Sequence, residues 1–388
     1  MNKTVYLDNN ATTRTDPAVV MAMMPFFSER YGNPSSMHAF GGSIHKEIED
    51  AREKVAALIK ADPSEIVFTG SGSESNNHAI FGSIEALGTD STVITTRVEH
   101  PAVLQACRAL KEKGVNVIEV GVMSDGTLNI DEYSEALTTP GKKLVSMMWA
   151  NNETGVIFPI KTALEKARNA GAIFHTDAVQ AVGKLSEVDV SKLPVNMLSF
   201  SGHKIHAPKG IGVLYIRKGT RVAPFLKGGH QENGRRAGTE NVPYIVGLGK
   251  AAELAMEELA SGENKRIAAM RDKLQEGLIK CPDAIVNGSL KDRLPNTLNI
   301  SFEYIEGEGI LYHLSDAGIC ASSGSACTSG ALEPSHVVRA MGVPFTAVHG
   351  STRFSLSRYN TEEEIDYVLS VVPEVVDRLR ALSPFVTS

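Results

Sequence analysis

The stretch Leu198-Ser-Phe-Ser-Gly-His-Lys-Ile-His-Ala-Pro-Lys-Gly-Ile-Gly-Val-Leu-Tyr-Ile216 decides how this chain is organised. Two short apolar runs flank a Ser-Gly-His-Lys turn and a Pro-Lys-Gly loop. This pattern predicts two strands joined by irregular backbone. The turn places Lys204 at the end of the first strand, where a reactive amine would be useful.

Lys204 shares its turn with Ser201 and His203. A lysine near other cations, or held out of water, has a lowered pKa, and the neutral amine attacks carbonyl carbons. Such an amine forms a Schiff base, which pyridoxal 5′-phosphate (PLP) requires. The alternative is a solvated turn lysine with no chemical role. Lys209 is the rival in the same stretch, but its Pro-Lys-Gly setting predicts a hairpin tip, so we prefer Lys204.

From about residue 64 to residue 216 the chain repeats a unit of strand, loop and helix, which predicts a mostly parallel sheet covered on both faces. Polar residues recur at the predicted strand ends: His100, Asn152, Asp177 and Gln180. Open α/β sheets bind their ligands at this edge. A lone histidine is often structural, and Asp177 could simply cap a helix. As a functional group, Asp177 would pair with a pyridinium nitrogen and keep the ring protonated.

A phosphate site is predicted where the strand 66–69 meets the loop Gly70-Ser-Gly-Ser-Glu-Ser-Asn-Asn77 and a following helix. Unpaired backbone N–H groups and the helix dipole would point at the same place. Gly/Ser loops before helices are also common as simple caps.

Further upstream, apolar residues at three- and four-residue steps predict a helix that begins at Ser43.

The second half of the chain predicts a further domain. A polar, glycine-rich loop at 228–243 precedes a helical pattern from 244 to 280 that breaks near Gly262. Small residues then surround Cys327 in Ser-Ser-Gly-Ser-Ala-Cys, which places this sulfur on a segment able to move. Arg353 alternates with apolar neighbours on a strand and could clamp a carboxylate. The last helix begins with a capping box from Thr361 to Glu364.

Composition narrows the function classes. The 388 residues suggest roughly two or three domains. A net charge of −6 gives no general attraction to nucleic acid or an anionic membrane. We expect neither as a partner. The sequence shows no apolar N-terminal segment and no membrane span, which predicts a cytoplasmic protein. Four cysteines without a C-x-x-C pair are too few for a disulfide framework, and no metal site is expected.

Taken together, Ser201-Gly-His-Lys204, Asp177-x-x-Gln180 and Ser-Ser-Gly-Ser-Ala-Cys327 resemble the cysteine desulfurases of the NifS/IscS group, which are fold-type I PLP enzymes. The likeness extends from Leu-Asp-Asn-Asn-Ala-Thr-Thr13 to Arg-Phe-Ser-Leu-Ser-Arg358. The resemblance implies a large PLP-binding domain at 15–260 with a mostly parallel seven-stranded sheet. It also implies a smaller α+β domain, formed by 1–14 and 261–388, that carries the Cys327 loop.

The resemblance also implies the roles of single residues. Lys204 would hold PLP as a Schiff base, Asp177 would pair with the ring nitrogen, Gln180 would bond the ring hydroxyl and His100 would stack on the ring. The phosphate would be held by Gly72, Ser73, Ser201 and His203, with Thr239 from the partner subunit of a homodimer. Asn152, next to the cofactor, and Arg353 would bind the substrate carboxylate. Cys327 would take sulfur from L-cysteine as a persulfide, leaving L-alanine, and pass it to an iron–sulfur scaffold protein.

Some positions depart from the commoner family pattern. Gly72-Ser73 stands where relatives often have Ala-Thr, and Ala207 replaces a frequent glycine. The short C-terminal end favours the NifS-like branch. Two alternatives stay open at this point: a selenocysteine lyase or other PLP-dependent lyase, which the Cys327 loop disfavours, and a non-catalytic sulfur carrier that keeps only the fold. Intact Lys204, Asp177 and Arg353 argue against the second.

Overall fold

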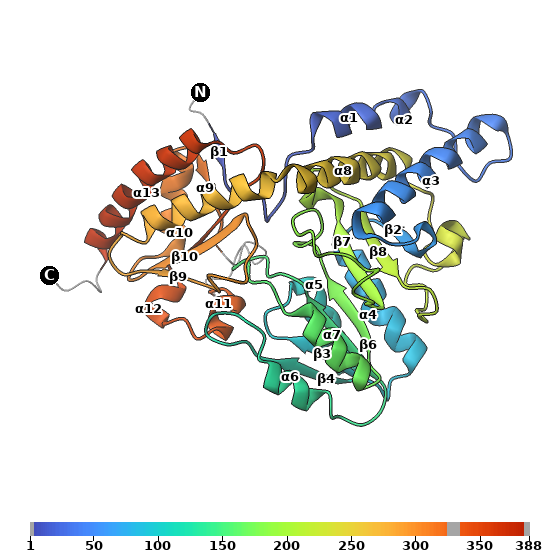
Figure 1. Cartoon of the computed structure of the whole chain (residues 1–388), viewed down its shortest axis with the longest axis horizontal. Coiled ribbons are helices and arrows are strands. Elements are labelled where there is room, and N and C mark those ends of the chain that lie inside the picture. Colours follow the sequence, from blue (N-terminus) through green and yellow to red (C-terminus); the bar gives the residue numbers. More distant parts are fainter. Residues whose placement is uncertain (1–3, 324–333, 384–388) are drawn as a thin grey trace.

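The computed structural model describes residues 4–323 and 334–383, and in it Lys204 lies directly after a strand of a seven-stranded sheet. In spatial order the strands are β2 (Ile66–Thr69), β8 (Gly212–Ile216), β7 (Met197–Ser201), β6 (Ile173–Asp177), β5 (Lys143–Met148), β3 (Thr92–Thr96) and β4 (Asn116–Val120). Only β8 runs antiparallel to its neighbours, so the predicted mostly parallel sheet is confirmed. Figure 1 shows it on the right.

Both faces of this sheet are covered because its strands are apolar on both sides. Val67 packs against α4 (Gly72–Leu87) and α5 (Pro101–Glu112), whereas its neighbours Ile66 and Phe68 pack on the opposite face. That opposite face is covered by α1 (Pro17–Met23), α3 (Ala39–Ile59), α6 (Ile130–Ala136), α7 (Ile160–Asn169) and α8 (Val242–Ser261), with the short α2 (Pro25–Ser28) beside α1. Such alternation is the side-chain geometry of a strand.

Two local expectations need correction. The helix expected from Ser43 begins at Ala39, because the His38 side chain accepts a hydrogen bond from the Gly41 N–H and caps it. Gly41 and Gly42 weaken the helical signal over that first turn. The strand β4 was not predicted, since it lies at the edge of the sheet and is only partly buried.

A second group of elements packs around its own apolar cluster, on the left of Figure 1. Its antiparallel sheet has the order β12 (Ser351–Ser355), β10 (Thr297–Phe302), β9 (Ala284–Val286), and β1 (Val5–Tyr6) pairs with β11 (Ile319–Cys320) beside it. Its helices are α9 (Glu263–Leu278), α10 (Gly307–Asp316) and α13 (Glu362–Leu382), with the short α12 (Phe345–Val348) beside β10. The short α11 (His336–Ala340) instead buries Val337 in the apolar cluster of the large sheet. The exact domain boundaries at 14/15 and 260/261 stay a prediction.

The N-terminal segment connects the two groups of elements at the place where the site forms. Asn9 donates from its side chain to the Ser355 carbonyl, on β12. Four residues later, the Thr13 hydroxyl donates to the carbonyl of His203, in the lysine turn. Residues 9–13 therefore run from the small sheet to the edge of the large one. Within residues 4–323 and 334–383, no helix is long and apolar enough to cross a membrane.

Candidate active site

A cavity of about 320 Å³ lies at the carboxyl ends of the parallel strands, between the large sheet and the N-terminal segment. It brings together ten residues singled out from the sequence: Gly72, Ser73, His100, Asn152, Asp177, Gln180, Ser201, His203, Lys204 and Arg353. They come from the ends of five strands of the large sheet, or the segments directly after them, and from β12, across more than 280 positions of sequence. Cys327 lies outside the described residues.

Lys204 ends a short 3₁₀ turn, Gly202–Lys204, directly after β7. Its ammonium donates to two backbone carbonyls of the N-terminal segment, those of Asn10 at 2.5 Å and Ala11 at 2.7 Å. These bonds hold the amine at the wall of the cavity. Lys209 is exposed, as expected for the tip of a loop.

Asp177 is the last residue of β6 and is buried. One carboxylate oxygen accepts a hydrogen bond from the Asn76 side chain at 2.6 Å, and the other accepts one from the Val179 N–H at 2.9 Å. The second contact is the local turn that the sequence suggested. The first comes from α4 and fixes the carboxylate toward the cavity.

The loop that the sequence predicted as a phosphate site is tightly packed around Gly72, the first residue of α4. A Cβ atom on Gly72 would approach Val179 Cγ2 to 3.0 Å and Ser201 Cβ to 3.2 Å. A Cβ on Gly212 of β8 would lie 2.4 Å from the Ser71 carbonyl carbon. Glycine is therefore needed at 212, where the contact is with backbone, whereas at 72 a methyl group would require only a small shift of the neighbouring side chains, in line with the alanine of many relatives. The start of the 16-residue helix α4 faces the cavity and is open to an anion.

Two histidines face the cavity in neutral form. Burial is the main cause that lowers the pKa of His100, and the Lys204 charge adds to it while Asp177 opposes it. His100 Nδ1 accepts a hydrogen bond from the Ala102 N–H, so the proton of the neutral ring lies on Nε2. Burial and the charge of Lys204 also lower the pKa of His203 to about 3. Neutral, flat rings suit stacking and hydrogen bonding rather than ion pairing.

Arg353 is 2% exposed, so the sequence-based alternative of a solvated arginine is wrong. Its Nη2 donates to an Asp8 carboxylate oxygen at 2.7 Å, and its Nη1 donates to the Asn152 carbonyl at 3.0 Å. Its Nε is buried without a hydrogen-bond partner among the described residues. A buried donor left unpaired beside a cavity indicates a missing acceptor.

Several neighbours of the site were not predicted. Asn10 and Asp8 hold Lys204 and Arg353, yet in the sequence their segment looked like a polar turn. Asn76 lies in the Gly/Ser loop that the sequence predicted as a phosphate site. Its contact with Asp177 was not predicted, because 101 positions separate the two residues. Glu99 is completely buried beside His100, and burial raises its pKa to about 8. In the sequence, the only sign that Glu99 belongs near the site is that it directly precedes His100, which was predicted at the end of a strand.

Thr239 does not reach the cavity. It is exposed and lines a different hollow together with Glu232 and Arg236. The part of the chain that the structure describes has no cluster of three or more His, Cys, Asp or Glu side chains able to hold a metal ion.

The cavity residues fit PLP. A helix N-terminus that faces the cavity suits the phosphate, and a fixed carboxylate suits the pyridine nitrogen. The amine of Lys204 lies on the same cavity and suits the aldehyde carbon. The unpaired donor of Arg353 leaves one place for a substrate carboxylate.

Comparisons with known proteins agree with this fit. The Aminotransferase class-V family model matches residues 5–368. A cysteine desulfurase of Nostoc sp. PCC 7120 is 58% identical, covering 98% of this chain and 95% of that protein. The cysteine desulfurase NifS of Azotobacter vinelandii is 55% identical, covering 98% and 94%. A solved NifS-like protein superposes with a TM-score of 0.91 at 42% identity, covering 97% of this chain and all of that one. The chain therefore belongs to the class-V aminotransferases, a PLP-dependent family, and within it to the cysteine desulfurases of the NifS group.

Proposed function

We propose that this enzyme removes sulfur from L-cysteine, leaves L-alanine and carries the sulfur as a persulfide on Cys327. The observation that supports this most is the meeting of Lys204, Asp177 and the unpaired Arg353 donor on one cavity. An amine, a carboxylate and a guanidinium are the groups needed to hold PLP and an amino acid together.

The residues of the chain divide the work of binding. PLP, when bound, supplies an electron-withdrawing ring that stabilises negative charge at the substrate α-carbon. Lys204 would hold it covalently, Asp177 would hold the pyridine nitrogen, and Gln180 would donate to the ring hydroxyl oxygen. His100 would lie against the ring. Gly72, Ser73, Ser201 and His203 would bind the phosphate, for which the open start of α4 is the structural support.

Substrate binding would rest on Arg353 and Asn152. The Arg353 guanidinium keeps its Nε donor for a carboxylate, while Asp8 and the Asn152 carbonyl fix its plane. A fixed guanidinium orients a carboxylate better than a mobile one, because less side-chain entropy is lost on binding. The substrate would then lie on the side of the cavity formed by β12 and the N-terminal segment.

Cys327 would complete the reaction. Its thiolate attacks the substrate sulfur, a sulfur–sulfur bond forms, and the bond between sulfur and carbon breaks. The electron pair stays with the carbon skeleton, which takes up a proton and leaves as alanine. We further propose a small domain of residues 1–14 and 261–388 that carries this cysteine, and an iron–sulfur scaffold protein that accepts the sulfur.

We also propose that the enzyme is a cytoplasmic homodimer in which Thr239 of each subunit completes the phosphate site of the other. The exposure of Thr239 in the single chain is compatible with this arrangement. Sedimentation equilibrium tests the dimer. A Thr239→Ala variant that forms dimers but binds PLP as tightly as the unchanged enzyme would contradict the role of the side chain.

The first experiment is to measure alanine formed from L-cysteine by the purified enzyme, with a reducing thiol present to clear sulfur from Cys327. We expect alanine and sulfide in equal amounts. Cys327→Ala should keep its PLP and lose the persulfide, whereas the matched control Cys320→Ala should keep both. A yellow protein that yields no alanine would redirect the assignment to a selenocysteine lyase or another PLP-dependent lyase. Persulfide formed at the normal rate by Cys327→Ala would contradict the role of Cys327.

A further inference from the structure

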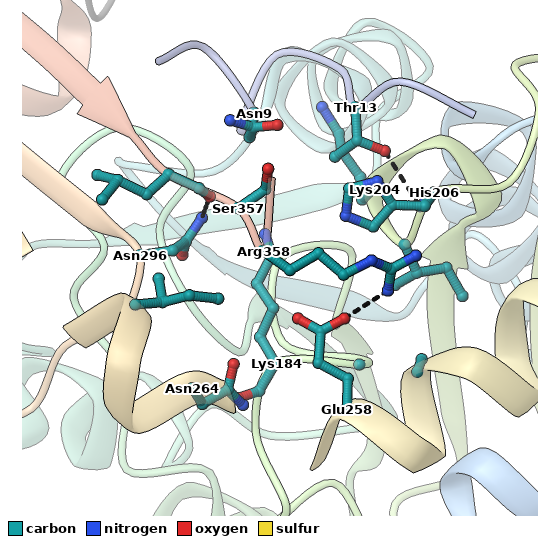
Figure 2. A pocket seen from close by; sticks show the side chains of 15 residues that line it. Asn9, Thr13, Lys184, Lys204, His206, Glu258, Asn264, Asn296, Ser357 and Arg358 are labelled. Atoms are coloured by element: carbon teal, nitrogen blue, oxygen red, sulfur yellow. Dashed lines mark hydrogen bonds and ion pairs between the residues drawn. The ribbon is translucent and has the colours of Figure 1, made fainter. Parts of the chain in front are cut away.

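Behind Lys204 lies a second, small pocket of about 30 Å³ that the proposed function does not use. Figure 2 shows it lined by Lys204 and, across from it, by Lys184, Glu258 and Arg358. Lys184 and Lys204 both line this pocket, and Lys204 also lines the PLP cavity. Lys204 is therefore the residue that the two spaces share.

Lys184 is connected to the PLP cavity through Gln180, which lines that cavity. Its Nζ donates to Gln180 Oε1, four residues earlier in the chain, at 2.6 Å. Gln180 is 3% exposed, so water does not compete for its amide. The backbone at Lys184 is held separately, because the Asn264 side chain donates to its carbonyl at 2.8 Å. This backbone contact does not involve the side chain of Lys184.

The amide of Gln180 has only one orientation that satisfies both of its neighbours. Its Nε2 donates to the Asn10 carbonyl at 3.0 Å, while its Oε1 accepts from Lys184. Turning the amide over would set Nε2 against the donors of an ammonium and Oε1 against a carbonyl oxygen. The second N–H of Nε2 stays available to the PLP cavity that Gln180 lines.

We propose that Lys184 is a positioning residue, which holds the Gln180 amide so that its NH₂ group, rather than its oxygen, faces the ring oxygen of PLP. This inference rests on the proposed function, in which Gln180 donates to that oxygen. An amide turned the other way would set two acceptors against each other and weaken PLP binding.

The charge on Lys184 supports the same role. Burial, with Lys204 and Arg353, lowers the pKa of Lys184 to about 7, while Glu258 raises it. Glu258 is itself bound to Arg358 at 2.5 Å, so it compensates the ammonium only in part. Below this pKa the ammonium has donors only, and the orientation of Gln180 is then fixed most strictly.

The test compares Lys184→Met, Lys184→Arg and, as a matched surface control, Lys192→Met. Lys192 is 83% exposed in its side chain. The readouts are the dissociation constant of PLP from each enzyme, measured by reconstitution below pH 7, and the pH titration of the bound cofactor's absorption band. We expect Lys184→Met to weaken PLP binding about tenfold, the size of one lost hydrogen bond to a charged group, and to shift the titration. Lys184→Arg should restore most of both, and Lys192→Met should change neither.

A double-mutant cycle with Gln180→Ala separates positioning from a general structural effect. If Lys184 acts through Gln180, Lys184→Met has no further effect on PLP binding once Gln180 is alanine. Equal effects of Lys184→Met in both backgrounds, or an unchanged PLP dissociation constant in the single variant, would overturn the proposal. Failure of the unchanged enzyme to bind PLP or to turn over cysteine would instead count against the proposed function.

Discussion

The two walls of the active-site cavity are built in different ways. One, the sheet wall, consists of Gly72, His100, Asp177 and Ser201, each placed at the end of its own strand or at the start of the next helix. The other, the N-terminal wall, consists of Asn10, Ala11 and Arg353. Its parts are held by contacts between the two ends of the chain, such as Asp8 with Arg353, 345 positions apart.

This difference suggests a division of labour. The sheet wall presents a helix start, a carboxylate and a flat ring, which are groups that bind PLP. The N-terminal wall presents a guanidinium whose Nε donor has no hydrogen-bond partner among the described residues, and such a group suits a substrate carboxylate. Lys204 joins the walls, since it follows a strand of the sheet and binds two N-terminal carbonyls. Substitutions in the sheet wall should therefore weaken PLP binding, and substitutions in the N-terminal wall should weaken substrate binding. Lys204 is the exception, because it contacts both walls.

The largest loss of turnover is expected when Lys204, which contacts both walls, is replaced. Lys204→Ala should lower turnover of L-cysteine about a thousandfold or more, because the chain loses both the covalent anchor of PLP and the amine that can move a proton in the site. Lys209→Ala, in the same loop but exposed, is the matched control and should retain turnover. Steady-state alanine formation gives the comparison. Comparable losses in both variants would contradict the assignment of Lys204.

The next effect is expected on the N-terminal wall. Arg353→Gln should raise the KM for L-cysteine roughly ten- to a hundredfold, because the carboxylate loses charge-assisted hydrogen bonds. PLP content should remain near that of the unchanged enzyme. Arg378→Gln, an exposed substitution on α13, serves as the control. Loss of PLP with an unchanged KM would show that the two walls do not divide the work in this way.

The same contrast explains what the sequence could predict. Lys204, Asp177 and His100 were predicted because each stands at the end of a single strand, or soon after it, and both the apolar run and the turn that follows it can be recognised locally. Asn10 and Asp8 belong to the site through partners 194 and 345 positions away, and no local pattern encodes such a contact. Strand β4 was missed for a related reason, because an edge strand with exposed residues lacks the apolar run.

A smaller effect is expected at Asn76, which supports the sheet wall through Asp177. Asn76→Ala removes one hydrogen bond to the carboxylate and should weaken PLP binding about three- to tenfold, with little change in KM. Asp8→Asn is the matched variant on the other wall, since it weakens the support of Arg353. It should change the KM and leave PLP binding as it was. Equilibrium binding of PLP and cysteine kinetics test both, and the reverse pattern would refute the division between the walls.

The smallest effect on turnover is expected at Glu99, and its prediction is therefore tested on stability. Glu99 lies completely buried behind the sheet wall. Burial raises its pKa from 4.5 to about 8. The folded enzyme therefore keeps a proton that the unfolded chain releases. The contribution of Glu99 to the free energy of unfolding is full below about pH 4.5 and is lost as the pH rises through about 8. Glu99→Gln lacks this titration, so its free energy of unfolding should fall less from about pH 5 to about pH 9, by on the order of a few kcal/mol. Urea unfolding of both proteins over this range tests the prediction. Parallel pH profiles would mean that Glu99 is ionised in the folded enzyme, and the sheet wall would then hold a buried negative charge beside His100.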